Sequence, residues 1–190
     1  MNKKDLVKID IQNYSEQWSK EIADLFYQSV HAIDSSVYTV EQKAAWAPTP
    51  IDYAFWSARL EAKKPLVAIV NKQVAGFIEL DTDGHIDCTY THPDFQRMGV
   101  ASKLYEHLLA EAIRRNMKRL YVEASITAKP FFEHRGFAVF TNGDRLLLRG
   151  VVLHPELPSL RCTYPHHHLG EPLRGMSSGC FLHVWLNASE

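Results

Sequence analysis

The segment Gln96–Ala101 constrains the fold of this chain more than any other feature, because it joins a strand-like run to a strongly periodic helix. The run His85–Thr91 ends just before Pro93, a residue that cannot donate a hydrogen bond within a sheet. After Gly99 the apolar residues recur at the i, i+3, i+4 spacing of a helix with one buried face. The first turn of a helix attracts an anion through its free backbone N–H groups and its dipole. With Gly99 and the small Ser102 nearby, the segment is suited to a pyrophosphate.

Two interpretations of these residues remain open from their chemistry alone. One is a phosphate-binding helix start, and the other is an ordinary helix start with a close-packed glycine. The segment has no Gly-Lys-Ser/Thr, so it is not a Walker P-loop, and it lacks the Gly-x-Gly-x-x-Gly of dinucleotide-binding folds.

The segment resembles motif A of the GNAT N-acetyltransferase superfamily, written Gln/Arg-x-x-Gly-x-Gly/Ala. It is preceded by His-Pro-Asp-Phe, and Phe131–Phe137 resembles the end of the superfamily's helix before its last hairpin. The run Gly84–Phe137, together with Tyr38 and Trp46, is similar to the bacterial YafP-like branch. The resemblance extends over roughly residues 6–153 and implies an acetyl-CoA-dependent N-acetyltransferase.

The hydrophobic pattern independently predicts an α+β fold. Strands are expected near 6–11, 66–70, 74–80, 85–91, 119–124 and from 137 onward, and helices over 15–30, 39–46, 51–63, 99–113 and 127–135. The helix between the strands at 85–91 and 119–124 requires a parallel crossover. We therefore expect a single GNAT-like domain with a mixed, mostly antiparallel sheet and helices on both faces. Its central parallel pair is expected to splay at the cofactor cleft.

Composition limits the class of protein. At 190 residues and 46% hydrophobic residues, the chain suits one substantial core. The formal net charge of -1 predicts neither a nucleic-acid partner nor a membrane surface. The three cysteines have no metal-ligand spacing, and no metal is expected. Without a signal-like or membrane-spanning segment, we expect a cytoplasmic monomer or homodimer.

The resemblance implies where acetyl-CoA lies. Its pantetheine arm fills the gap beside the fourth strand, so main-chain contacts are expected from Thr89, Tyr90 and Thr91. The pyrophosphate contacts are expected from Gln96, Arg97, Met98, Gly99, Val100, Ala101 and Ser102.

Acetyl transfer needs a neutral amine and a proton for the departing thiolate. By period two, His85, Asp87 and Thr89 share one strand face, and Asp87 or His85 there is a candidate base, with a buried His-Asp pair as the equal alternative. Glu79 is a weaker candidate because an outward, solvated carboxylate is commoner.

Two further residues are judged against the family. The tyrosine acid of many GNAT enzymes falls at Phe132, which cannot donate a proton. Ser125 stands where relatives often carry asparagine, although helix capping is its stronger interpretation.

The acceptor pocket is expected from Tyr38, Gln42, Trp46 and Trp56, which suit a small amphipathic or aromatic amine. Tyr38 is also the alternative source of a proton. Core packing is the ordinary use of such residues.

Residues 154–190 form a Pro/His-rich segment separate from the domain at 1–153, with a late strand as one option at 180–186. The histidine run 166–168 has no ligand partners at metal spacing.

The sequence thus predicts acetyl transfer to the primary amine of a small molecule. A non-catalytic acyl-CoA-binding module and a peptide or protein N-acetyltransferase are the alternatives.

Overall fold

The computed structural model describes residues 8–142 and 145–151, with side chains up to residue 139. The segment 154–190, with its predicted late strand and histidine run, lies outside the described residues. No helix in the described ranges is long and apolar enough to cross a bilayer.

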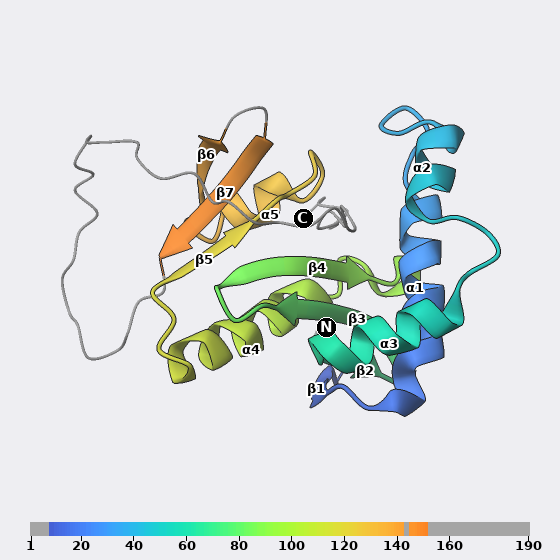
Figure 1. The fold of residues 1–190 in the computed structure, drawn as a ribbon, viewed down its shortest axis with the longest axis horizontal. Coiled ribbons are helices and arrows are strands. Elements are labelled where there is room, and N and C mark those ends of the chain that lie inside the picture. Colours follow the sequence, from blue (N-terminus) through green and yellow to red (C-terminus); the bar gives the residue numbers. More distant parts are fainter. Residues whose placement is uncertain (1–7, 143–144, 152–190) are drawn as a thin grey trace, which may run out of the picture.

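A seven-stranded mixed sheet forms the centre of the fold, in the order β1-β2-β3-β4-β5-β7-β6 (Figure 1). The strands are β1 (Asp10–Asn13), β2 (Leu66–Val70), β3 (Gln73–Leu80), β4 (His85–Thr91), β5 (Arg119–Val122), β6 (Ala138–Asn142) and β7 (Arg145–Val151). Only β4 and β5 are parallel among these neighbours, and every other pair is antiparallel. The predicted mixed sheet with one central parallel pair is confirmed.

Helices cover both faces of the sheet, as predicted. They are α1 (Ser19–His31), α2 (Val40–Trp46), α3 (Tyr53–Lys63), α4 (Val100–Arg114) and α5 (Lys129–Glu133), with short 3-10 turns at Glu16–Trp18 and Pro93–Phe95. One core joins α4 and α5 to the sheet, and the other joins α1 and α3 to the opposite face. In Figure 1, α1, α2 and α3 gather at the end of the molecule toward which β4 points.

One local feature starts a helix, and another sets how closely a helix packs on the sheet. Thr39 caps α2 in a reciprocal capping box, because its hydroxyl accepts from the Gln42 N–H while its own N–H donates to Gln42 Oε1. On the other face, a Cβ at Gly76 would stand only 2.8 Å from the Tyr90 carbonyl oxygen and 2.9 Å from Val100 Cγ1. Glycine is therefore needed for the close packing of α4 on β3.

A β-bulge in β4 changes which side chains share a face. Ile78 pairs with Thr89 and Leu80 with Ile86, so two residues of β4, Asp87 and Cys88, oppose Glu79 alone. Because paired residues point to the same face, Thr89 lies with Ile78 on the α4 side. The prediction that Thr89 shares a face with His85 and Asp87 is wrong, since the extra residue reverses the alternation.

The parallel pair opens soon after it begins. β4 and β5 pair at His85 with Tyr121 and at Ile86 with Val122, whereas β4 continues to Thr91. The half of β4 from Asp87 to Thr91, which we call the free half of β4, extends beyond this pairing. The predicted splay of the parallel strands is confirmed.

Candidate active site

The loop before α4 has the geometry of an anion site. Gly99 is the N-cap of α4, with φ of +85° and no side-chain capping bond, so the first amides of the helix, at Val100, Ala101 and Ser102, are not capped by a side chain. Around the position of a Cβ at Gly99, no described atom beyond its chain neighbours lies within 4 Å. Gly99 is therefore not a close-packed glycine, and its left-handed backbone leaves the helix start open.

The rest of the predicted phosphate segment lies beside this opening. Arg97 also has a positive φ, of 61°, and its side chain is exposed, whereas Gln96 and Met98 are half-buried. The segment connects the 3-10 turn at Pro93–Phe95 directly to α4. All of its residues thus border the start of one helix.

The free half of β4 provides the second part of a donor cleft. The hydroxyls of Thr89 and Thr91 are buried, and neither has a hydrogen-bond partner in the described part of the chain. The Thr91 carbonyl accepts a hydrogen bond from Ser29 Oγ at 3.0 Å, while the Tyr90 side chain is fully buried in the core on the α1 side. The free half of β4 is paired with β3 on one edge and extends beyond its pairing with β5 on the other. An open strand edge followed by an open helix start fits an extended chain that ends in a pyrophosphate.

A buried cluster of charges occupies the other face of β4, beneath α3. Arg59 Nη2 donates to Glu79 Oε2 at 2.5 Å and to Asp87 Oδ2 at 3.0 Å, and lies 3.4 Å from Cys88 Sγ. The ligand atoms of Glu79, Asp87 and Cys88 lie within 4.8 Å of one another, a spacing that would suit a metal ion. The guanidinium of Arg59 contacts all three, so it takes the place of the cation.

The cluster continues toward His85. Lys63 Nζ contacts both Asp81 Oδ1 and Asp87 Oδ2 at 2.7 Å, and His85 Nδ1 lies 3.4 Å from Asp81 Oδ2. Asp87 is therefore held by two cations, Arg59 and Lys63. His85 also stacks on Tyr121, with the ring centroids 4.9 Å apart.

Burial and neighbouring charges shift two pKa values in this cluster. Burial raises the pKa of Glu79 to about 7, although the charge of Arg59 acts in the opposite direction. Burial alone would lower the pKa of His85, but the hydrogen bond to Asp81 and the charge of Asp87 hold that pKa above its usual value. Glu79 is fully buried, so its expected position as an outward, solvated carboxylate is wrong.

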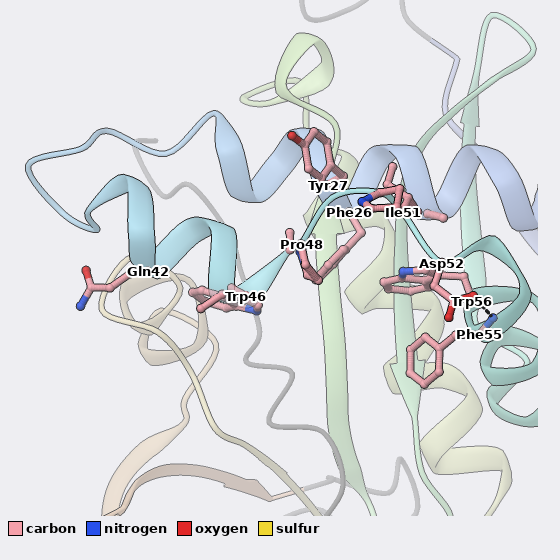
Figure 2. A pocket seen from close by; sticks show the side chains of 13 residues that line it. Phe26, Tyr27, Gln42, Trp46, Pro48, Ile51, Asp52, Phe55 and Trp56 are labelled. Atoms are coloured by element: carbon pink, nitrogen blue, oxygen red, sulfur yellow. Dashed lines mark hydrogen bonds between the residues drawn. The ribbon is translucent and has the colours of Figure 1, made fainter.

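A pocket of about 560 Å³ lies among α1, α2 and α3 (Figure 2). Its lining is mainly apolar and aromatic and comprises Ala23, Phe26, Tyr27, Gln42, Ala45, Trp46, Ala47, Pro48, Pro50, Ile51, Asp52, Phe55 and Trp56. It adjoins β4, because the rings of Phe26 and Tyr90 are 4.9 Å apart.

Three of the predicted acceptor residues, Gln42, Trp46 and Trp56, line this one pocket. Tyr38 is not among its lining residues but contacts Trp46, with the ring centroids 5.8 Å apart. The Gln42 oxygen is already used in the capping box, at 2.8 Å from the Thr39 nitrogen. Figure 2 shows Gln42 well away from Phe55 and Trp56, so it lies toward the outer end of the pocket.

Comparison with known proteins decides the family. A model described as "Acetyltransferase (GNAT) domain" matches residues 34–155, more than half of the chain. The chain belongs to the GNAT acetyltransferase family. It is 37% identical over 129 residues to the uncharacterized N-acetyltransferase YafP of Escherichia coli (strain K12), covering 68% of this chain and 81% of the relative.

Solved structures agree with the GNAT fold. A GCN5-related N-acetyltransferase from Rhodopseudomonas palustris superposes with a TM-score of 0.69 at 28% identity, over 75% of this chain and 94% of the other. The PaiA N-acetyltransferase of Thermoplasma acidophilum, solved with coenzyme A, has a TM-score of 0.62 at 17% identity, over 76% and 99% of the two chains. The protein is thus an N-acetyltransferase, and as a GNAT enzyme it uses acetyl-CoA as its cosubstrate.

Two positions that often carry catalytic groups in GNAT enzymes have structural roles here. Phe132 is fully buried, with its ring centroid 5.1 Å from that of Phe137. Ser125 Oγ accepts from the Ala128 N–H at 3.1 Å and lies 3.0 Å from Thr127 Oγ1. Ser125 therefore caps the turn that leads into α5, a local role of the kind that the sequence favoured for it.

Sequence reasoning missed several residues of the site. Arg59 and Lys63 were not singled out from the sequence, although their i, i+4 spacing one turn after Trp56 places them on a shared helix face. The acidic side chains within residues 79–87 were the sequence signal that Arg59 and Lys63 have anionic partners. Asp52 and Phe55 were also missed. Asp52 is the N-cap of α3, where capping is the commoner role of an aspartate, and Phe55 lies in the first turn of that helix.

Proposed function

We propose that this GNAT enzyme transfers an acetyl group directly from acetyl-CoA to the primary amine of a small molecule. The observation that carries the proposal is the 560 Å³ pocket beside the free half of β4. A volume of this size is typical of small-molecule sites. Phe26, which lines the pocket, packs on Tyr90 of β4, so the pocket lies one side chain away from the strand that borders the donor cleft.

On the donor side, we assign the pyrophosphate to the segment Gln96–Ser102 and the pantetheine arm to the main chain of Thr89–Thr91. The open left-handed position at Gly99 supports the first assignment. The extension of β4 beyond its pairing with β5 supports the second. On the acceptor side, we assign Trp46 and Trp56 to the pocket wall, with Gln42 at its outer end and Tyr38 behind Trp46.

The reaction releases one proton overall. The ammonium form of the acceptor loses a proton, its nitrogen forms a bond to the thioester carbon, and the C–S bond breaks. The thiolate of coenzyme A takes up the second proton from the new amide nitrogen, by way of solvent. A thiol of ordinary pKa, about 8.5, needs only modest help to leave at neutral pH, so Phe132 is compatible with catalysis.

We propose that His85, rather than Asp87, accepts the proton that the ammonium group of the acceptor loses. Asp87 is held by Arg59 and Lys63 at 3.0 and 2.7 Å, whereas the Nδ1 of His85 lies 3.4 Å from Asp81 Oδ2 and its ring stacks on Tyr121. The raised pKa of His85 makes it a stronger base than an ordinary histidine. Asp87 then acts on the reaction through the pKa of His85, and Ser125 supports the adjacent turn.

The release of free thiol from acetyl-CoA in the presence of a panel of small primary amines tests the proposal. We expect turnover with at least one small amine and none with tertiary amines of the same skeleton. Binding of acetyl-CoA without thiol release would instead support a non-catalytic acyl-CoA module. Turnover only with peptides would support peptide N-acetylation.

A further inference from the structure

The side chains that line the pocket of Figure 2 carry more information than its volume. Five of them are aromatic and come from three helices: Phe26, Tyr27, Trp46, Phe55 and Trp56. Pro48, Pro50 and Ile51 add further apolar wall. Such a surface favours a flat, apolar ligand that can contact several ring faces and edges.

The charge that lines the pocket has only one sign. Asp52 is the single charged side chain among the described residues that line it. One of its oxygens caps α3 by accepting from the Phe55 N–H at 2.9 Å, and Figure 2 shows the side chain beside Phe55 and Trp56. A carboxylate brought into this pocket would meet a like charge and lose water without a cationic partner.

We propose that the acceptor is an aromatic primary amine that carries no carboxylate, with its ring held by the aromatic wall that Phe55 completes. Asp52 is the residue that excludes the corresponding amino acid. This inference rests on the proposed function, because it names the acceptor class of the same site.

Phe55 offers a clean probe because it is not part of the core. Its side chain is 46% exposed, while Tyr53 on the same helix is 42% exposed and lies outside the pocket lining. Phe55→Ala should weaken the binding of 2-phenylethylamine by about three- to tenfold, the range expected for one aromatic contact. The same change should leave propylamine nearly unaffected, and Tyr53→Ala is the matched control for both amines.

Asp52 is probed by a change that keeps its cap. Asparagine is as good an N-cap as aspartate, so Asp52→Asn removes the charge and leaves the start of α3 intact. The wild type should prefer 2-phenylethylamine over phenylalanine at least about tenfold. Asp52→Asn should narrow that preference about two- to fivefold. Glu61→Gln removes a negative charge from an exposed site on the same helix and should leave the preference unchanged.

Binding and turnover are measured separately, so that the two proposals fail separately. The fluorescence of the protein's tryptophans, two of which line the pocket, reports binding of each amine, and thiol release reports transfer. Aromatic binding with the predicted Phe55 and Asp52 effects supports the ligand class of the pocket, and transfer to the same amine makes that ligand the acceptor. Such binding with no transfer to any amine would refute the proposed function. Equal binding of 2-phenylethylamine, phenylalanine and propylamine would overturn the acceptor class while transfer to any of them upheld the function.

Discussion

The start of α4 allows the phosphate assignment to be tested with two isosteric substitutions, Gly99→Asp and Gly99→Asn. At φ of +85° any side chain is strained by about 1–2 kcal/mol, and Asn and Asp tolerate this region best among non-glycine residues. The strain is nearly equal in the two variants, so the difference between their affinities for acetyl-CoA reports the effect of the charge alone. A carboxylate about 4 Å from a phosphate is repelled by about 1 kcal/mol in water and about 4 kcal/mol near a protein surface. Gly99→Asp should therefore bind acetyl-CoA at least about tenfold more weakly than Gly99→Asn, or about 1.4 kcal/mol.

Calorimetric titration with acetyl-CoA measures this difference directly. Acetyl-pantetheine, which lacks the pyrophosphate, serves as the control donor, and the two variants should use it with equal kcat/KM. Equal melting temperatures would show that both variants are folded alike. If folded Gly99→Asp bound acetyl-CoA as tightly as Gly99→Asn, the pyrophosphate would not lie at this helix start, and the reasoning would fail.

Three further predictions concern the proton groups. His85→Gln should flatten the acidic limb of the plot of kcat/KM against pH. Asp87→Asn should keep that limb and move its midpoint to lower pH, because the Asp87 charge raises the pKa of His85. A flattened acidic limb in Asp87→Asn would instead make Asp87 the base. Tyr38→Phe should alter mainly the acceptor KM, and a thousandfold loss of kcat at constant KM would identify Tyr38 as the acid instead. Glu79 has a pKa raised above its unfolded value, so its contribution to stability is present below about pH 4.5 and is lost as pH rises toward 7. The free energy of unfolding in urea should fall over that range, and Glu79→Gln should reduce the slope. His85, whose pKa is raised above 6.5, acts in the same direction only at higher pH. An unchanged slope between pH 4.5 and 6.5 in Glu79→Gln would therefore refute the Glu79 assignment.

Those parts of the fold that depend on local pattern were predictable from the sequence. The stripe of apolar residues in 99–113 gave α4, and the predicted strand 85–91 coincides with β4. The opening between β4 and β5 followed from the family resemblance and the parallel crossover. The phosphate segment was recognisable for a related reason, since its function depends on backbone geometry and small residues, and both leave a mark in the order of residue types.

The charged face of the site was not predictable, because it depends on a bulge and on a distant helix. Period two carried the expected face from His85 through Thr89, and one extra residue opposite Glu79 reversed it. Glu79 was expected in solvent because an outward, solvated carboxylate is commoner than a buried one. Its partner, Arg59, comes from α3, 20 residues earlier, and only tertiary packing brings the two together.

The bulge and the buried arginine also explain how the acceptor pocket is placed against the donor cleft. By turning Asp87 and Cys88 toward the same face, the bulge creates a site that Arg59 Nη2 fills through three contacts. Trp56 lies one helical turn before Arg59, so these contacts fix the distance of that turn of α3 from β4. Trp56 in turn packs on Phe77 of β3 and lines the pocket. The ion pairs that hold α3 to the sheet therefore also set where the pocket wall stands relative to the free half of β4.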